Sequence, residues 1–435
     1  MSISEQQINQ ALSEVYDPDL GQSIVKLGFV KDIDIQDGAV SLSIELTSPA
    51  CPVKDALKAE AEEAIRALPD VKSVAITMTA RSPKAAQPVE KSGLQDVGNL
   101  IAVASGKGGV GKSTVAASMA RELANRGYAV GLLDVDLYGP SIPTLFDHHE
   151  VGLSGDENDM VMPEDFDGLK VMSFGFWLGE QPAIMRGPMV SNYVSQFLHQ
   201  VNWGVLDYLF LDLPPGTGDI QITLTQSARI DGAVIVTTPH VLSAADVGKA
   251  VRMFDRVSVP ILGVVENMSH FVAPDTGTKY EVFGTGAARR ISEQFGLPIL
   301  GRLPLSAEEY GGPIRSNPHT NEIRQAVDEM VRSLGRARVG VSVPDVTTDE
   351  SSLTLLYADG ETVSVDFKTL RAGCGCAVCV DEFSGEQKLD PDSIPDDIHP
   401  ESVGQIGNYA VSIKWSDGHD TGFFPYRRIK ELAKS

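Results

Sequence analysis

The chain has 435 residues, and at about 150 residues per domain this length predicts roughly three domains rather than one uniform globule. The composition, 42% hydrophobic and 22% charged, is that of an ordinary globular protein and excludes disorder, collagen and coiled coil as the main class. The formal net charge is −23, which disfavours binding to nucleic acid or to an anionic membrane surface because like charges repel.

Residues 1–16 show neither the basic region nor the apolar core of a secretory signal, and no apolar stretch approaches the roughly 20 residues that span a bilayer. We therefore expect a cytoplasmic protein without membrane contact. The sequence holds only four cysteines. In a reducing compartment, clustered cysteines indicate metal binding before disulfide formation.

The first segment predicts a small α+β domain over residues 1–82, because helical and strand patterns alternate in it. The expected elements are a helix near 4–14, strands at 28–35 and 39–46, a helix at 53–67 and a strand at 71–79. Residues 81–95 combine Pro, Lys, Gln and Ser without apolar periodicity, which predicts a linker.

The central segment, residues 96–336, alternates short apolar runs with helical patterns, as βαβ units do. Such continuous apolar runs indicate a parallel sheet that is covered on both faces. The expected strands lie at 99–105, 128–136, 208–215, 232–239 and 261–268, and the expected helices follow Lys112 and lie near 320–334.

The last segment, residues 349–435, predicts a β-rich domain after a second linker at 336–349. Asp359-Gly360 and Asp417-Gly418 each stand between apolar runs, and this dipeptide is the strongest short-range signal for a hairpin turn. We therefore expect two hairpins in this domain.

Residues 106–113, GKGGVGKS, match the pattern G-x-x-x-x-G-K-[ST] between a predicted strand and a predicted helix, which is the context that the motif requires. The glycines let successive backbone N–H groups converge on phosphate oxygens at a helix N-terminus. In such a loop Lys112 reaches the β- and γ-phosphates and Ser113 ligates Mg²⁺. The residues expected to bind the nucleotide are Gly106, Lys107, Gly108, Gly109, Val110, Gly111, Lys112, Ser113 and Thr114. The predicted fold class is therefore α/β, with a central P-loop NTPase and a mostly parallel sheet, flanked by the small α+β domain and a β-rich metal-binding domain.

Carboxylates follow two of the predicted strands, at the edge where ligands bind in open α/β sheets. Asp212 fits the Walker B position that holds Mg²⁺ through its water shell. Asp136 is our candidate for orienting the attacking water, with Asp134 as the alternative. The other role open to Asp134 and to Asp219 is that of a helix cap. For Asn267, after the next strand, two roles are open: a hydrogen bond to the base edge and a place in a turn.

The loop resembles the deviant Walker A motif of the MinD/ParA superfamily of ATPases, because Lys107 stands inside KGGVGKS. In that superfamily the matching lysine crosses a dimer interface to the partner's nucleotide. The resemblance therefore implies a homodimer and a catalytic role for Lys107 beside Lys112, Asp136 and Asp212. The alternative for Lys107 is a solvated loop charge.

Further motifs make the chain similar to the Mrp/ApbC family of ATP-dependent iron–sulfur cluster carriers: DVDLYGPSIP, MRGPM, DLPPGTGD, VENMSHF and FGTGAARRIS. The first segment, with DPDLGQSIVKLGFVKDI and LTSPACPVKDAL, resembles the small iron–sulfur assembly domain that precedes many such ATPases. The last segment, with LRAGCGCAVCVDE and WSDGH, resembles the N-terminal domain of gamma-butyrobetaine hydroxylase. The resemblance implies ATP hydrolysis coupled to cluster loading or transfer. It also implies ATP, Mg²⁺ and a [4Fe-4S] cluster as bound groups, and apo iron–sulfur proteins and the assembly machinery as partners.

The chain departs from this family in the segment SHFVAPDTG. Family members generally carry a C-P-x-C pair there, through which two subunits share a cluster, whereas this chain has Ala273 and Thr276. Neither side chain ligates iron as a thiolate does, so a bridging cluster is not expected at this position. Any cluster must therefore be held by the four cysteines.

Cys374, Cys376 and Cys379 place three thiolates on one short loop, one ligand short of a tetrahedral shell. His419, in a predicted hairpin turn, is the candidate for the fourth position. Its spacing from Cys379 is similar to that in the hydroxylase domain, where the matching residues bind zinc. Three interpretations stay open: a structural Cys₃His Zn²⁺ site, a labile [4Fe-4S] cluster on the same three thiolates, and free thiols.

Cys51 directly precedes Pro52, which fits the first position of the predicted helix. With Cys51 at the cap, the helix dipole would lower the pKa of its thiol and favour the thiolate. Cys51 is thus a candidate transient cluster ligand, and the alternative is a small buried residue at a helix start.

These features together predict an iron–sulfur cluster carrier with ATPase activity. One alternative is a positioning ATPase of the MinD/ParA kind, which the acidic charge and the cysteine-bearing flanks disfavour. The other is an ATP-dependent adaptor that contains structural zinc and transfers no cluster.

Overall fold

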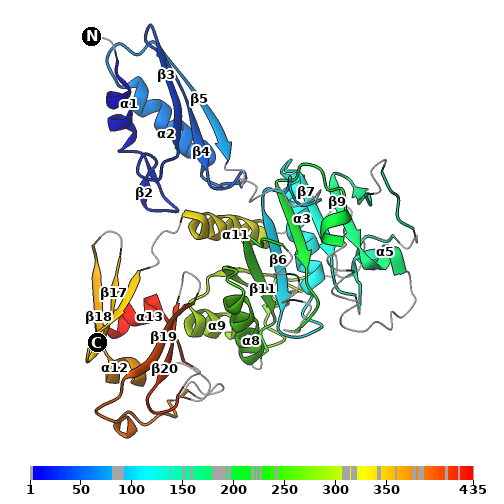
Figure 1. Ribbon diagram of the computed structural model, residues 1–435. Coiled ribbons are helices and arrows are strands. Elements are labelled where there is room, and N and C mark those ends of the chain that lie inside the picture. Colours follow the sequence, from blue (N-terminus) through cyan, green and yellow to red (C-terminus); the bar gives the residue numbers. More distant parts are fainter. Residues whose placement is uncertain are drawn as a thin grey trace. The chain divides into compact units, whose positions relative to one another are not determined.

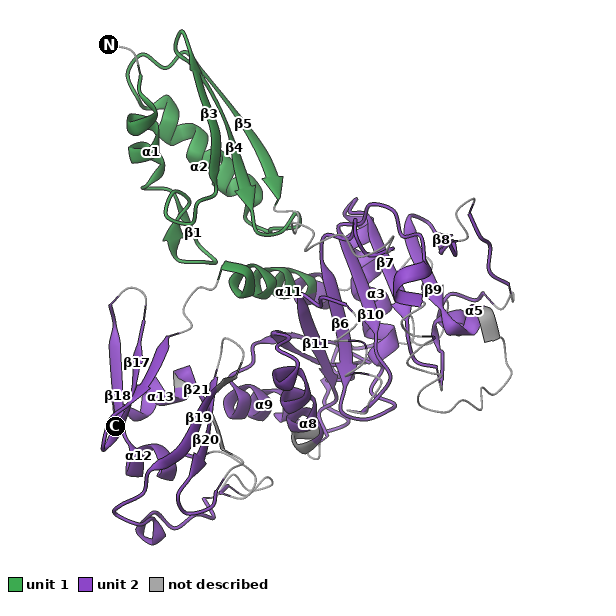
Figure 2. Cartoon of the chain, viewed as in Figure 1, with its two compact units in different colours: residues 1–87, 327–341 green, residues 88–326, 342–435 purple. Residues whose placement is uncertain are grey.

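The computed structural model contains α/β and β-rich parts (Figure 1). It describes residues 3–80, 93–137, 139–148, 152–156, 160–178, 193, 197–216, 221, 224, 228–240, 243–305, 314, 321–339, 344–357, 360–374, 379–380, 387–406, 410–419 and 422–434. The chain forms two compact units, residues 1–87 with 327–341 and residues 88–326 with 342–435 (Figure 2). Within the described ranges, none of the helices combines the length and the apolar character that crossing a bilayer demands.

The first unit contains a three-stranded sheet, in which β4 lies between its antiparallel partner β3 and its parallel partner β5. Alternate residues of β4 are buried, and Ile8, Ile44 and Ile65 meet in the core beneath the helices. The five elements expected here are confirmed, whereas the two-residue strands β1 and β2 were too short to predict. The elements are α1 (Glu5–Leu12), β1 (Tyr16–Asp17), β2 (Gln22–Ser23), β3 (Val30–Gln36), β4 (Ala39–Leu46), α2 (Lys54–Arg66) and β5 (Ser73–Ala80).

Helix α11 (Asn321–Val339) is longer than predicted, and its second half packs within the first unit. Arg332 Nε lies 3.1 Å from Asp19 Oδ1, and Arg338 donates a hydrogen bond to the Thr47 carbonyl at 2.8 Å. These contacts hold the last turns of the helix in place. The expected linker at 336–349 therefore contains the end of α11 and a strand, β16 (Asp345–Thr348).

The central sheet has eight strands in the order β15-β12-β11-β6-β10-β7-β9-β8, all parallel to their neighbours except β8. Strands β6, β7, β10, β11 and β12 are buried at every position, which confirms the predicted covered parallel sheet. The strands are β6 (Leu100–Ser105), β7 (Val130–Asp134), β8 (Glu164–Phe166), β9 (Leu169–Ser173), β10 (Tyr208–Asp212), β11 (Gly232–Thr237), β12 (Ile261–Glu266) and β15 (Ile299–Arg302). The helices are α3 (Lys112–Asn125), α4 (Ile142–Leu145), α5 (Phe174–Leu178), α8 (Ser243–Arg256) and α9 (Ala287–Phe295).

The C-terminal region is β-rich, as predicted, with two three-stranded antiparallel sheets. Trp415 is fully buried and meets Phe367 and Phe424 edge to face. The hairpin expected at Asp417-Gly418 is confirmed, with Gly418 at φ +82°. The elements are β16, β17 (Ser352–Leu356), β18 (Thr362–Asp366), α12 (Phe367–Ala372), η1 (Pro391–Ser393), β19 (Pro400–Ile406), β20 (Ala410–Trp415), β21 (Gly422–Pro425) and α13 (Tyr426–Leu432).

Candidate functional site

The phosphate loop joins the buried strand β6 to helix α3, as the motif predicts. Gly109 and Gly111 have φ angles of +76° and +77°, left-handed conformations that favour glycine. At Gly106, a Cβ atom would lie 2.5 Å from the backbone carbon of Asp246, so a larger residue would require the backbone to shift. A Cβ atom at Gly108 would meet nothing within 4 Å. The loop is therefore tightly packed at its start and open in its middle.

Lys112 and Asp212 form a buried ion pair beside this loop. Lys112 Nζ lies 2.5 Å from Asp212 Oδ1 and 3.3 Å from Ser113 Oγ. Asp212 Oδ2 is also buried and has no hydrogen-bond partner among the residues that the structure describes. A buried carboxylate oxygen without a hydrogen-bond donor costs free energy. Asp212 and Ser113 therefore fit a bound group that supplies such a donor. The water shell of Mg²⁺ is such a group, and Ser113 and Asp212 are the residues that would hold the ion.

Asp134 lies next to Asp212 in the register of β7 and β10, and it is fully buried. Its carboxylate accepts hydrogen bonds from the Asp136 backbone N–H at 3.0 Å and the Ser173 hydroxyl at 2.9 Å. Burial, together with the neighbouring charge of Asp212, raises the pKa of Asp134 to about 8, although Lys112 opposes the shift. Asp134 thus closes a turn, and its carboxyl keeps its proton to a higher pH than an exposed aspartate does. Orientation of water by Asp136, which is 9% exposed, stays a prediction.

Asn267 ties the phosphate loop to the neighbouring strands. Its side chain is fully buried, and Nδ2 donates a hydrogen bond to the Val110 carbonyl at 3.0 Å. Its backbone N–H donates to the carbonyl of Thr237 at the end of β11. Sequence reasoning missed this role because no local pattern relates positions so far apart. Contact with a base stays a prediction, and Asp219 lies outside the described residues.

Glu266, the neighbour of Asn267, is a residue that the sequence analysis did not single out. Its carboxylate is 1% exposed, accepts the Ala288 backbone N–H at 3.0 Å and lies 2.6 Å from Arg302 Nε. It therefore anchors α9 and β15 to the strand that carries Asn267. An acidic residue at the end of an apolar strand is the signal that would have found it, because a buried charge requires partners.

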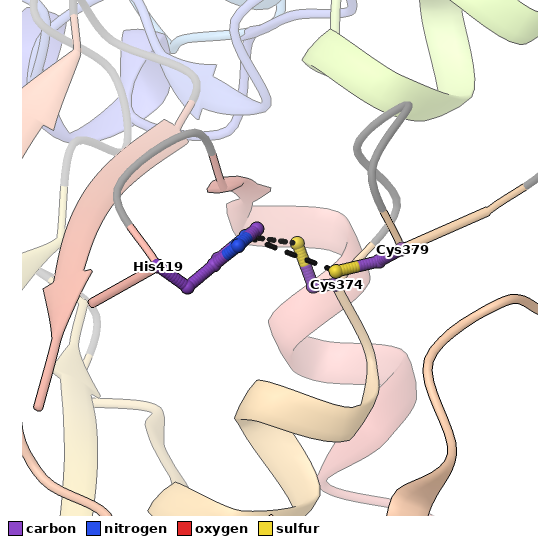
Figure 3. Close-up of side chains that lie close together, drawn as sticks. All are labelled: Cys374, Cys379 and His419. Carbon is purple, nitrogen blue, oxygen red and sulfur yellow. Dashed lines mark hydrogen bonds between the residues drawn. The ribbon is translucent and has the colours of Figure 1, made fainter. Parts of the chain in front are cut away.

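Cys374, Cys379 and His419 meet in the C-terminal region (Figure 3). Their ligand atoms all lie within 4.8 Å of one another, with His419 Nε2 3.3 Å from Cys374 Sγ and 3.8 Å from Cys379 Sγ. Both cysteines are buried. Thiolate and imidazole are ligands that zinc and iron accept, so the donor set fits such a metal. Cys376, the third predicted cysteine ligand, lies outside the described residues.

Two separate segments bring these ligands together. Cys374 follows the end of α12, where Gly373 packs so closely on α13 that a Cβ atom would lie 2.5 Å from Leu432 Cδ1. His419 closes the turn between β20 and β21, and its carbonyl accepts the Trp415 backbone N–H at 2.8 Å. The ligand geometry therefore depends on how α12, α13 and this hairpin pack.

A family model described as NUBPL iron-transfer P-loop NTPase matches residues 96–334, more than half of the chain. The chain belongs to this family. Its first segment, residues 5–78, matches the family described as iron-sulfur cluster assembly protein. Residues 345–430 match the family described as gamma-butyrobetaine hydroxylase-like, N-terminal. The family predicted from the phosphate loop and its surrounding motifs is thereby confirmed.

Relatives with known names align with most of this chain. It is 42% identical to the chloroplastic Fe-S cluster assembly factor HCF101 of Arabidopsis thaliana, over 99% of this chain and 83% of that protein. It is 44% identical to the iron-sulfur cluster carrier protein of Synechocystis sp., over 68% of this chain and 85% of that protein. A solved nucleotide-binding protein from Archaeoglobus fulgidus, in complex with ADP, is 36% identical with a TM-score of 0.45, over 56% of this chain and 89% of that one.

The segment SHFVAPDTG, which has Ala273 and Thr276 in place of a cysteine pair, forms a short hairpin. Strands β13 (Phe271–Val272) and β14 (Lys279–Tyr280) pair antiparallel, and the Ala273 N–H donates to the Thr278 carbonyl at 2.9 Å. Ala273 lies at the turn and Thr276 is exposed. The methyl group of Ala273 and the hydroxyl group of Thr276 are thus the side chains at these two positions, where no bridging cluster was expected.

Two expectations about Cys51 are wrong. Helix α2 begins at Lys54 with Val53 as its N-cap, so Pro52 is not the first helical residue and Cys51 is not the cap. Burial raises the pKa of the Cys51 thiol to about 11, a hydrogen bond from Val53 opposes the shift, and the charge of Asp17 adds to it. The thiol is therefore protonated at neutral pH, and its role as a transient cluster ligand stays a prediction that requires the metal to displace the proton.

Proposed function

We propose that this chain is an ATPase that binds iron–sulfur clusters and transfers them to apoproteins, working as a homodimer in the cytoplasm. The observation that carries the proposal is the phosphate loop with Lys112 paired to Asp212, in a chain whose relatives are named iron-sulfur cluster carrier proteins. The first segment supports it through its match to an assembly family. Apo iron–sulfur proteins and the assembly machinery are the partners.

Hydrolysis of ATP in such a site requires positioning and charge neutralisation more than covalent chemistry by the protein. Lys112 leaves Asp212 for the β- and γ-phosphates, because their charge replaces that of the carboxylate. Ser113 and Asp212 would hold Mg²⁺, whose charge would offset that of the phosphates. Asp136 orients the attacking water, and the partner subunit's Lys107 reaches the same nucleotide.

The exchange of partners by Lys112 links the nucleotide to the rest of the fold. Lys112 holds β10 through Asp212, and Asn267 holds the loop to β12. Loops that a γ-phosphate orders relax after hydrolysis, so the two states differ in these contacts. This difference drives loading or release of the cluster, which we propose to be of the [4Fe-4S] type.

The cysteine–histidine centre favours a second candidate function. Buried Cys374 and Cys379 closed by His419 are typical of a structural zinc site, which stabilises a small domain without chemistry. In that case the protein is an ATP-dependent adaptor that transfers no cluster. Three thiolates that hold a labile [4Fe-4S] cluster, with Cys376 as the third, favour the carrier instead.

The test compares the wild-type protein with Lys112→Ala in ATP hydrolysis and in cluster transfer from anaerobically reconstituted protein to an apo acceptor. We expect hydrolysis to fall at least about 100-fold, because the principal positive charge on the phosphates is lost, and ATP-dependent transfer to disappear. Lys414→Ala, an exposed lysine on β20, is the control and keeps wild-type rates. Undiminished hydrolysis by Lys112→Ala would contradict the site, and a zinc-only protein that transfers nothing would favour the adaptor.

A further inference from the structure

Arg371 lies against the cysteine–histidine centre, three positions before Cys374 on helix α12. Its side chain is 5% exposed, and its guanidinium NH1 donates a hydrogen bond to Cys379 Sγ at 3.3 Å. Its Nε donates to Asp417 Oδ2 at 2.8 Å. The other oxygen of that carboxylate, Oδ1, accepts the backbone N–H of His419 at 3.0 Å. One hydrogen-bonded path therefore runs from a ligand sulfur through Arg371 and Asp417 to the backbone of the ligand histidine.

The charges along this path suit a loaded metal centre. Each coordinating thiolate brings a negative charge into a buried site, where it requires a donor or a cation nearby. Arginine stays charged when buried, and its planar fork offers donors to two acceptors in fixed directions. Asp417 balances the guanidinium and holds the turn from which His419 projects. The two segments that supply the ligands are thus joined by side chains that do not themselves bind the metal.

We propose that Arg371 and Asp417 are positioning residues of the metal centre, Arg371 by its hydrogen bond to the Cys379 sulfur and Asp417 by fixing the His419 turn. The inference rests on the proposed metal centre and holds for zinc or for a cluster, because both bind through thiolates. Arg371 and Asp417 thus set the metal affinity of the centre without themselves being ligands.

Loss of a hydrogen-bond partner of a metal ligand lowers metal affinity by a typical factor. Groups that hydrogen-bond to metal ligands typically contribute about 10–100-fold to metal affinity. Arg371→Met keeps the length and the apolar stem of the side chain but removes the donors, so zinc affinity should fall within that range. Removal of a hydrogen bond also makes the sulfur a better electron donor, so the thiolate-to-Co²⁺ absorption band should move to lower energy. Asp417→Asn keeps the side-chain shape and should give a smaller loss of affinity.

The experiment uses the full-length chain, first loaded with Co²⁺ and then titrated with Zn²⁺ against a chelator. The variants are Arg371→Met, Arg371→Lys and Asp417→Asn. Lys368→Met is the matched control, because Lys368 is a cation on the same helix that pairs with Asp396 at the surface. Thermal unfolding of the metal-free proteins tests whether Arg371→Met merely weakens the fold.

We expect Arg371→Met to lose affinity and shift the cobalt band, Arg371→Lys to recover part of both, and Lys368→Met to match the wild type. The metal-free proteins should unfold alike. Wild-type affinity and an unshifted band in Arg371→Met would overturn the proposal, as would equal destabilisation with and without metal. A wild-type protein that shows no thiolate-to-cobalt band would refute the metal centre itself, and the proposed positioning role with it.

Discussion

The phosphate loop and the cysteine–histidine centre differ in how widely their residues are separated in the sequence. The loop is one stretch, residues 106–114, to which Asp212 and Asn267 are added from later strands. The metal centre joins Cys374 to His419, 45 positions further along the chain. A contiguous motif takes its shape with its own strand and helix, whereas a dispersed site exists once its two segments have packed. We therefore expect changes in the loop to act on the nucleotide and on the stability of the central sheet, and changes in the centre to act on the C-terminal fold.

The sharpest test of this difference is Cys374→Ser. We expect it to reduce metal affinity by more than the roughly 100-fold that loss of an outer partner costs, because a ligand itself is removed. Unfolding of the C-terminal region should move to lower temperature, as it should after metal removal by a chelator, while ATP hydrolysis stays near the wild-type rate. Metal analysis and calorimetry measure the first two effects. Lys368→Met, at a surface residue that pairs with Asp396, is the control, and an equal metal content in Cys374→Ser would contradict the centre.

Within the loop, Gly106→Ala should cause the next largest effect. The new Cβ atom would lie 2.5 Å from the backbone of Asp246, which cannot give way as a flexible side chain can. We expect a loss of about 1–3 kcal/mol in the free energy of unfolding, measured by urea denaturation. Gly108→Ala, where nothing lies within 4 Å, should keep the wild-type stability. Equal losses in both variants would show that the close approach at Gly106 does not limit the loop.

Asn267→Ala tests whether the loop depends on a strand far from it in the sequence. The Val110 carbonyl loses its donor at 3.0 Å, so the loop becomes less ordered and ATP affinity should fall roughly tenfold. Calorimetric titration with a non-hydrolysed ATP analogue measures the affinity. Asn267→Asp keeps the shape but lacks the N–H donors, and it should lose at least as much. If Asn267→Asp bound like the wild type, the hydrogen bond would not be what holds the loop.

The last test concerns Asp134 and pH. The pKa of this carboxyl is raised from 3.8 to about 8, so between these values the folded protein holds a proton that the unfolded chain releases. Stability therefore decreases as pH rises through this range. Asp134→Asn keeps an acceptor for the Ser173 hydroxyl but does not titrate, and its stability relative to the wild type should increase with pH. Urea denaturation at about pH 5 and about pH 7 measures the difference, and a difference that does not change with pH would contradict the raised pKa.

The strands and helices of the central sheet were predictable where apolar runs are continuous, as in β6 and β10. The edge strands β8 and β15, and β9 beside β8, were missed because three to five residues offer too little pattern to identify. At Cys51 the sequence instead predicted a feature that the structure lacks, because the neighbouring residues suggested a helix cap. The pKa of its thiol is set mainly by burial, which the local sequence does not record.

The amino-acid sequence alone was sufficient for the phosphate loop, the family and the clustered cysteines, because backbone conformation and ligand chemistry depend on adjacent residues. The fold decided which distant groups meet. It brought Lys112 to Asp212, and it brought His419 to Cys374. Such pairings follow from strand register and helix packing, which depend on the whole core and not on any one segment.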